Sequence, residues 1–494
     1  MKMHPQLFLA GAAVLLLLVL VCSFAQVDLD LFHLLGIGRE IAHTGRVPWT
    51  DSTSYLPTLH PVVHHEWLSG LLFFGTINIS GSSGLLALRW LLVAAIAWLT
   101  LAAAQRRGAP IVLVLLLAPL AIVLVGPALT LIRAQVLTLV MMAAFLLLLR
   151  SERYTVALAA LALHVCWLNL HAGFVVGWGL VLAHVIEVAL RERRLTRPWL
   201  HFLLAAPLLI AVNPWGLHYY TYLLRALPMP RPQISEWAPL WQAQPYIIGA
   251  CALSWLLAIY AIAKLGLRRT PGALLVIVAA LLALWHQRHG SIYGLVWLAV
   301  VPAWLAETPL RQQVESLFRH RVTTIGASAL LLAIVLIILR EKPWQLRMPV
   351  NAAMPGEPPP RIIFPQGAVA HLRTTGFNGH LLAPFETAAY VSWHLAPQVK
   401  TAIDSRYEVA FDPALARQFF DLLNARGNWP QTLATYPPDL VLVDNNSPLG
   451  AALLRHGAWR IIYKDDAYTI LAAAHDARWH YTDHRGQRTA AVFP

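Results

Sequence analysis

Long, uninterrupted apolar runs fill most of the chain before residue 340. Examples run from Leu7 to Val21, from Leu91 to Ala104 and from Val322 to Leu339. With their flanks, such runs approach the roughly 20 residues that a helix needs to cross the hydrocarbon core of a membrane. Because the runs are continuous and do not alternate with polar residues, they predict helices and not a transmembrane barrel. We place eleven transmembrane helices near residues 6–26, 84–104, 109–126, 130–149, 155–170, 173–190, 199–213, 246–264, 271–286, 291–306 and 322–340.

Composition agrees with this pattern, since 58% of the residues are hydrophobic and 12% are charged. A soluble domain carries roughly twice that share of charged residues. The net charge of +13 would suggest nucleic-acid binding in a soluble protein. Here the basic residues lie mostly in short loops between apolar runs, where they determine topology, so we expect no nucleic-acid partner. The three cysteines have no metal-ligand spacing.

Basic residues concentrate in alternate loops, which predicts that those loops and the N-terminus are cytoplasmic. With an odd number of helices, the C-terminal region then lies outside. We therefore expect a multi-pass protein of a bacterial inner (cytoplasmic) membrane with a periplasmic or extracellular C-terminal domain. Lys2, the apolar run after it and Ser23–Ala25 also resemble a cleavable signal peptide, but the run is long for one.

The long segments outside the helices define the expected domains. Residues 27–83 form a first external loop, and residues 343–360 contain six prolines and read as a linker. The sequence thus predicts a transmembrane domain over 1–342, the linker over 343–360, and a soluble α/β domain over 361–494.

The first external loop begins with Asp28 and Asp30, directly after the first helix. Apolar residues at 31, 34, 35, 37 and 41 favour a helix lying along the membrane surface. Gly45 and the turn residues after it predict where this helix stops. A second aqueous helix is expected to begin near His65 and Glu66.

Two roles are open for the carboxylates. Asp30 can take a proton from an acceptor hydroxyl, or Asp28 and Asp30 can together help hold a divalent cation. Asp28 can instead cap the helix. His65 and Glu66 are candidates for positioning a substrate or a metal, or they are ordinary surface residues.

Other polar residues lie at the external ends of the predicted helices. Because charged and amide groups at membrane depth are costly, several on one face indicate a site. Arginines and histidines there suit a phosphate or pyrophosphate group of a lipid. The alternative for Arg133 is a buried salt bridge with Glu66 or Glu236. The candidate substrate-binding residues on this face are Arg133, Asn169, His171, Glu236, Arg288 and His289.

The tail after residue 360 alternates short apolar runs with helical patterns, which predicts a small, mainly parallel sheet covered by helices. Asp404-Ser405-Arg406 and Asp444 fall just after strands, where α/β sheets tend to place ligands. The tail has no glycine-rich phosphate loop, so we favour an accessory lid or recognition domain. Expected strands are 380–384, 399–403, 440–443, 459–463 and 468–471, and expected helices are 386–395, 413–425 and 448–455.

Several of these pieces together resemble the GT-C superfamily of integral membrane glycosyltransferases, which includes the oligosaccharyltransferases and protein mannosyltransferases. More narrowly, the chain is similar to a poorly characterised bacterial GT-C-like group. The matching pieces are Asp28-Leu29-Asp30, Gly45-x-x-Pro48-x-x-Asp51, His65-Glu66-Trp67-Leu68, Arg133-Ala134-Gln135, Trp167-Leu168-Asn169-Leu170-His171, Asn213-Pro214-Trp215-Gly216, Glu236-Trp237 and Asp404-Ser405-Arg406.

The resemblance implies a GT-C-like helical membrane fold, a catalytic carboxylate at Asp30 or Asp28, and a polyprenyl-phosphate sugar donor that enters from the membrane. Two departures matter: Leu29 stands where the family often has Pro, and the tail lacks the Trp-Trp-Asp-type acceptor motif of oligosaccharyltransferases. The first hypothesis is a glycosyltransferase. A non-catalytic scaffold subunit of a larger membrane complex is the alternative, and a transporter ranks last because no internal repeat is visible.

Overall fold

The computed structural model describes residues 11–12, 14–19, 26–232, 234–317, 321–341, 345–349, 363–486 and 493. The first predicted span and the predicted linker lie largely outside these ranges. The chain divides into two compact units. The helical unit comprises Met1–Ala25, Ser83–Asn213 and Pro230–Gln345, and the loop–tail unit comprises Gln26–Ser82, Pro214–Met229 and Leu346–Pro494. The division of the chain at residues 342 and 361 stays a prediction.

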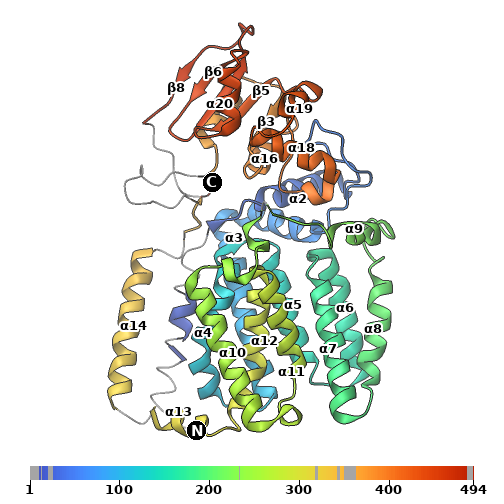
Figure 1. Cartoon of the computed structure of the whole chain (residues 1–494), viewed down its shortest axis with the longest axis vertical. Coiled ribbons are helices and arrows are strands. Elements are labelled where there is room, and N and C mark those ends of the chain that lie inside the picture. The colour runs from blue at the N-terminus through green and yellow to red at the C-terminus, as the bar shows by residue number, and fades with distance from the viewer. Residues whose placement is uncertain are drawn as a thin grey trace. The chain divides into compact units, whose positions relative to one another are not determined.

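The helical unit is a bundle of helices that run side by side (Figure 1). A helix coincides, within a few residues, with each predicted span from 84–104 onwards. The helices are the second part of α3 (Trp67–Arg106), then α4 (Ile111–Thr130), α5 (Gln135–Leu148), α6 (Tyr154–Leu170), α7 (Phe174–Glu192), α8 (Arg197–Leu209), α10 (Pro245–Leu265), α11 (Ala273–Trp285), α12 (Gly290–Leu305), α13 (Leu310–Leu317) and α14 (Arg321–Glu341). Short elements join them, namely β2 (Leu131–Ile132), η1 (Ser235–Trp237), η2 (Leu240–Gln242), η3 (Leu267–Arg269) and η4 (Gln287–His289).

Four helices in the described part of the chain are long and apolar enough to cross a membrane, namely α3, α4, α7 and α10. Three shorter helices, α5, α6 and α11, are also apolar. The chain is therefore a multi-pass membrane protein, and the count of eleven spans stays a prediction.

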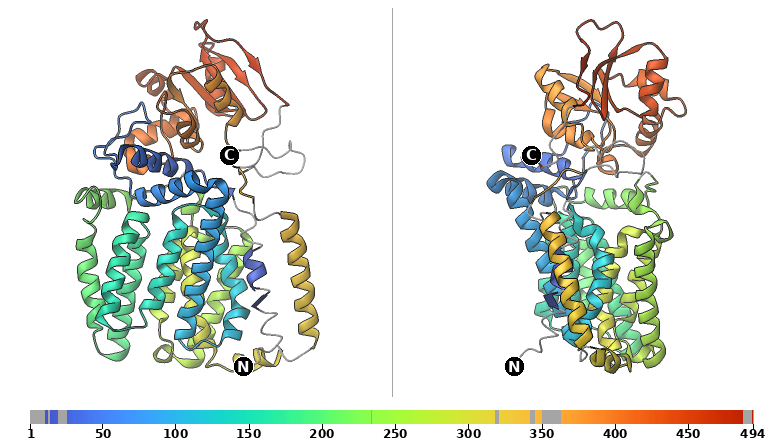
Figure 2. Two further views of the ribbon diagram at one scale, coloured as in Figure 1. Left: turned by 180° about the vertical axis from the view of Figure 1, so that it is seen from behind. Right: turned by 90° about the vertical axis from the view of Figure 1, so that its left-hand side faces the viewer.

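Helix α12 lies at the centre of this bundle, where it contacts α4, α5, α10 and α11. Nearly all of its residues are buried. Gly294 allows α4 to approach closely, because a methyl group there would come within 3.0 Å of the Leu124 Cβ. Such small-residue contacts are how membrane helices pack without a hydrophobic driving force between them. Figure 2 shows the same bundle from two further sides.

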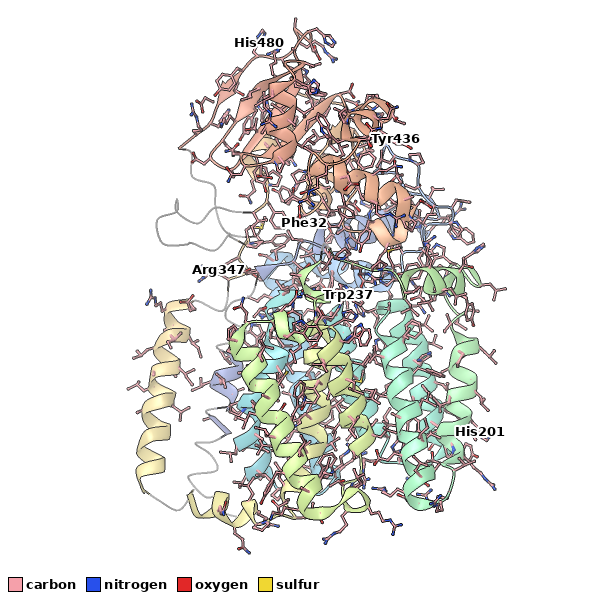
Figure 3. The ribbon with its side chains drawn as sticks, in the orientation of Figure 1. Phe32, His201, Trp237, Arg347, Tyr436 and His480 are labelled. Carbon is pink, nitrogen blue, oxygen red and sulfur yellow. The ribbon has the colours of Figure 1, made fainter. Side chains whose placement is uncertain are left out.

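The loop–tail unit begins with β1 (Gln26–Val27) and α2 (Leu31–Thr44). Helix α2 ends where Gly45 takes a φ of 68°, as the sequence predicted. The apolar side of α2 packs against protein: Phe32, labelled in Figure 3, lies edge-on to Phe364 and Tyr390 at centroid distances of 4.9 Å. The predicted second aqueous helix is the first part of α3, and Gly81, with a φ of 61°, breaks α3 before its apolar second part.

A six-stranded sheet forms the core of the tail, in the order β4-β3-β5-β7-β6-β8. The predicted parallel arrangement holds for β3 with β4 and β5, but β7 pairs antiparallel with both β5 and β6. The sheet is therefore mixed. Only three residues join β6 to β7, and so short a connection forces these two strands to pair antiparallel as a hairpin. The strands are β3 (Gly379–Leu382), β4 (Val399–Thr401), β5 (Leu440–Asp444), β6 (Trp459–Lys464), β7 (Tyr468–Ala473) and β8 (Thr482–Asp483).

Helices surround this sheet, and each predicted one is present. The sequence did not predict α9, α15, α17 and α19, of which α17 has only four residues and α19 only seven. The helices of the unit are α9 (His218–Ala226), α15 (Gln366–Thr374), α16 (Ala388–Leu395), α17 (Tyr407–Ala410), α18 (Pro413–Leu423), α19 (Trp429–Thr435) and α20 (Pro448–Arg455).

Two glycines let α2 and α3 cross in close contact. A methyl group at Gly38 would collide with the Gly70 carbonyl oxygen and would come within 2.6 Å of the Phe74 Cβ. We expect Gly38→Ala to lower the free energy of unfolding by about 1–3 kcal/mol, because the two backbones must move apart. Gly36→Ala is the matched control. Gly36 lies two residues earlier on the same helix, and a methyl group there would have no atom within 4 Å. Hydrogen exchange of α2 measures the difference, and equal protection in both variants would show that the crossing is not tight.

Candidate functional site

In the helical unit, Arg133 and Glu236 form a bidentate ion pair. The Arg133 Nη1 donates to Glu236 Oε2 at 3.0 Å, and Nη2 donates to Oε1. Burial alone would raise the pKa of the Glu236 carboxyl, but the Arg133 guanidinium, with Arg288 beyond it, brings that pKa below its usual value. The carboxylate therefore stays charged. Of the two pairings considered for Arg133, the structure shows the one with Glu236.

Two more arginines lie over the ring of Trp237, the residue after Glu236. The guanidinium carbons of Arg231 and Arg288 lie 4.4 and 4.6 Å from the centroid of the Trp237 ring. Cations over a tryptophan face are attracted by its negative π surface. Figure 3 labels Trp237 near the end of the helical bundle. We call Arg133, Arg231, Glu236, Trp237 and Arg288 the cationic cluster, because three guanidinium groups gather around the neighbouring residues Glu236 and Trp237.

The loop that carries Arg288 is fixed to the segment that carries Trp237. The backbone N–H of Gln287 donates to the Ala238 carbonyl at 2.9 Å, and His286 Nδ1 lies 2.5 Å from the Trp237 carbonyl oxygen. The His289 ring also contacts Trp237 edge-on. Burial, together with the Arg288 charge, lowers the pKa of His289 to about 4, so this ring is neutral at physiological pH. Predicted residues Arg133, Glu236, Arg288 and His289 thus come together.

Two other predicted residues make structural contacts at the ends of their helices. Asn169 donates from Nδ2 to the carbonyls of Val165 and Val212, which links the end of α6 to the segment after α8. His171 Nδ1 accepts the Gly173 N–H at 2.9 Å and lies 2.8 Å from Thr138 Oγ1. Because an N–H can only donate, Nδ1 is the unprotonated nitrogen of the neutral ring.

In the loop–tail unit, the two aspartates behave differently. The buried Asp28 accepts the Asp30 backbone N–H at 2.8 Å through Oδ1, which makes a local turn just before α2, whose N-cap position is Asp30. Asp30 immediately precedes α2, and its carboxylate makes no capping hydrogen bond to that helix. The Asp28 carboxylate thus holds the turn just before α2, and the Asp30 side chain makes no cap hydrogen bond to that helix.

His65 and Glu66 lie beside a tyrosine of α9. The His65 Nδ1 is 2.9 Å from the Tyr222 hydroxyl, the two rings stack at 5.1 Å, and His65 Nε2 is 3.5 Å from Glu66 Oε1. His33 and His64, which the sequence reading did not single out, interact electrostatically with this group. Burial lowers the pKa of His33 to about 4 and that of His64 to about 3. These two rings are neutral near pH 7.

A buried ion cluster connects the first loop to the tail. Arg406 donates to both oxygens of Asp404, and its Nη2 lies 2.9 Å from Asp51 Oδ2 and donates to Thr53 Oγ1 at 2.7 Å. Burial alone would raise the pKa of the Asp51 carboxyl, but Arg406 brings it below its usual value. Motif residues from distant parts of the sequence therefore hold one another, and Ser405 lies 3.1 Å from His33.

A metal ion would need several acidic or histidine ligands around one point. Among the residues that the structure describes, no group of three or more His, Cys, Asp or Glu side chains is placed to hold one.

No protein-family model matches the sequence, and no curated protein matches it by sequence. The fold is similar to that of several solved structures, among them the following two. The oligosaccharyltransferase of Archaeoglobus fulgidus, tethered to an acceptor peptide containing an NVT sequon, has a TM-score of 0.58 at 11% identity over 90% of this chain and 69% of its own. ArnT of Cupriavidus metallidurans, bound to undecaprenyl phosphate, has a TM-score of 0.52 at 12% identity over 96% of this chain and 99% of its own. At these identities the likeness establishes the fold alone, and that fold is the GT-C glycosyltransferase fold that the sequence resembled.

Proposed function

We propose that this chain is a membrane glycosyltransferase that moves a sugar from a polyprenyl-phosphate-linked donor to an acceptor on the non-cytoplasmic face of a bacterial inner membrane. The observation that carries the proposal is the fold likeness to ArnT over nearly the full length of both chains, since that structure holds undecaprenyl phosphate. The cationic cluster supports it, because arginines suit a lipid phosphate.

In the proposed reaction, the Asp30 carboxylate takes the proton of the acceptor hydroxyl. The acceptor oxygen bonds to the anomeric carbon as the bond from that carbon to the phosphate oxygen breaks. Polyprenyl phosphate leaves, and the cationic cluster stabilises the charge that develops on it. His65, Glu66 and His171 are proposed to position the substrates. The C-terminal domain is proposed to be periplasmic or extracellular, with the N-terminus in the cytoplasm.

Lipid binding tests the donor class. We expect the full chain in nanodiscs to bind undecaprenyl phosphate, and Arg288→Gln to weaken this binding about tenfold or more, because a hydrogen bond to a charged group contributes roughly 1.5–3 kcal/mol. Arg269→Gln is the matched control, since Arg269 pairs with Glu307 at an exposed position of the same unit. Titration with undecaprenol, which lacks the phosphate, completes the experiment. Equal affinity for undecaprenyl phosphate and undecaprenol would contradict a role of Arg288 in binding the phosphate. So would an equal loss of affinity in the Arg288→Gln and Arg269→Gln variants.

A further inference from the structure

A cavity of about 350 Å³ opens within the loop–tail unit, where the first external loop meets two helices of the tail. None of the side chains proposed above for catalysis or lipid binding lines it. Figure 3 labels Tyr436, which lies at the end of α19. The residues that line the cavity include Pro57, Leu59, Asp412, Leu415, Gln418 and Tyr436.

Hydrogen bonds fix the walls of this cavity. The Leu59 backbone N–H donates to the Ala410 carbonyl at 2.7 Å, which holds the loop against the end of α17, just before α18. Asp412 caps α18 by accepting the Ala414 N–H at 2.8 Å. The Tyr436 ring packs on Phe419 of α18 with centroids 5.7 Å apart. The cavity is therefore preformed, with its aromatic side chain held in place.

The lining combines flat apolar surface with neutral and acidic hydrogen-bonding groups. Tyr436, Pro57 and the two leucines offer apolar contact, while the Gln418 amide both donates and accepts and the Asp412 carboxylate accepts. No basic residue lines the cavity, so it does not suit a phosphate. A sugar ring has apolar C–H faces and hydroxyl groups around its edge, so it matches both kinds of lining surface.

We propose that this cavity binds a neutral saccharide of one or two sugar units. The volume is at the small end of the roughly 300–1,000 Å³ typical of ligand pockets, so it accommodates one or two sugar rings. Tyr436 stacks on the ring, and Gln418 and Asp412 bond its hydroxyl groups. The assignment of this saccharide to the acceptor or to the donor rests on the proposed function. The proposal that the cavity binds a saccharide does not depend on it.

Saturation-transfer NMR on the full chain in nanodiscs tests the site with glucose, galactose, mannose, N-acetylglucosamine and maltose as probes. We expect at least one probe to bind, and Tyr436→Ala to weaken it about tenfold or more, as the loss of an aromatic anchor does. Gln418→Ala, at an exposed position that α18 does not need for packing, should also weaken it. Gln431→Ala, an exposed glutamine of α19 outside the cavity, should not.

The Asp30→Asn variant should bind the probes as the unmodified chain does, so a failure of the proposed catalysis leaves this site testable. Displacement of the probe by an undecaprenyl-phosphate-linked sugar would assign the site to the donor, and binding that is unaffected by this lipid would assign it to the acceptor. Absence of binding by all probes would overturn the proposal. So would binding in the Tyr436→Ala and Gln418→Ala variants that is as tight as in the unmodified chain.

Discussion

An Arg406→Ala variant is expected to lose about 3–5 kcal/mol of the stability of the loop–tail unit. The side chains of Asp51 and Asp404 are 0% and 1% exposed, and both form an ion pair with this guanidinium. Removing it leaves two carboxylates buried without their counter-charge. Arg406→Lys should lose less, since it keeps the charge but not the bidentate geometry.

Hydrogen exchange of residues 51–56 and 400–410 is the measurement, because the loop and the tail pair there through the Tyr55 N–H and the Thr401 carbonyl at 3.0 Å. Arg417→Ala, at an exposed position on α18, is the control. If Arg406→Ala exchanged no faster than this control, the ion cluster would not be what holds the first loop to the tail.

An Asp30→Asn variant is expected to lose sugar transfer by about 100-fold or more, because general-base catalysis contributes roughly 10²–10⁴-fold. The substitution is nearly isosteric and removes only the basic oxygen. The start of α2 should be unaffected, since the Asp30 side chain does not cap it.

Asp28→Asn is the matched comparison two residues away. An amide oxygen can still accept the Asp30 N–H, so this variant should keep both the helix start and transfer within a few-fold of the unmodified chain. The opposite result, with Asp28→Asn inactive and Asp30→Asn active, would exchange the two roles. Full activity in both would remove the first-loop aspartates from the chemistry.

The elements of the fold were predictable because their signals are local. Continuous apolar runs place the helices, Gly45 marks the end of α2, and short apolar runs mark the strands β3 to β7. The orientation of β7 was less accessible, since parallel and antiparallel strands have similar local patterns. Its short connection to β6 was the signal that could have revealed it.

Pairings between distant residues were not predictable in the same way. Residue types in the sequence allowed Arg133 to pair with either Glu66 or Glu236, and only the structure shows that it pairs with Glu236. Asp51 and Arg406 were both noted as motif residues, yet nothing in a single sequence indicates that they touch across some 350 positions. Arg231 had no motif of its own, and only its place over Trp237 brings it into the cationic cluster.

We propose above all that this chain transfers a sugar from a lipid phosphate. The most direct measurement incubates the full chain in proteoliposomes with undecaprenyl-phosphate-linked, radiolabelled sugars and a membrane extract as acceptor source. It counts both the labelled product and the undecaprenyl phosphate released. We expect the two to appear in equal amounts with the unmodified chain and neither above background with Asp30→Asn. Stable binding of the donor lipids without turnover, and with partner proteins in fixed ratio, would instead identify a non-catalytic scaffold.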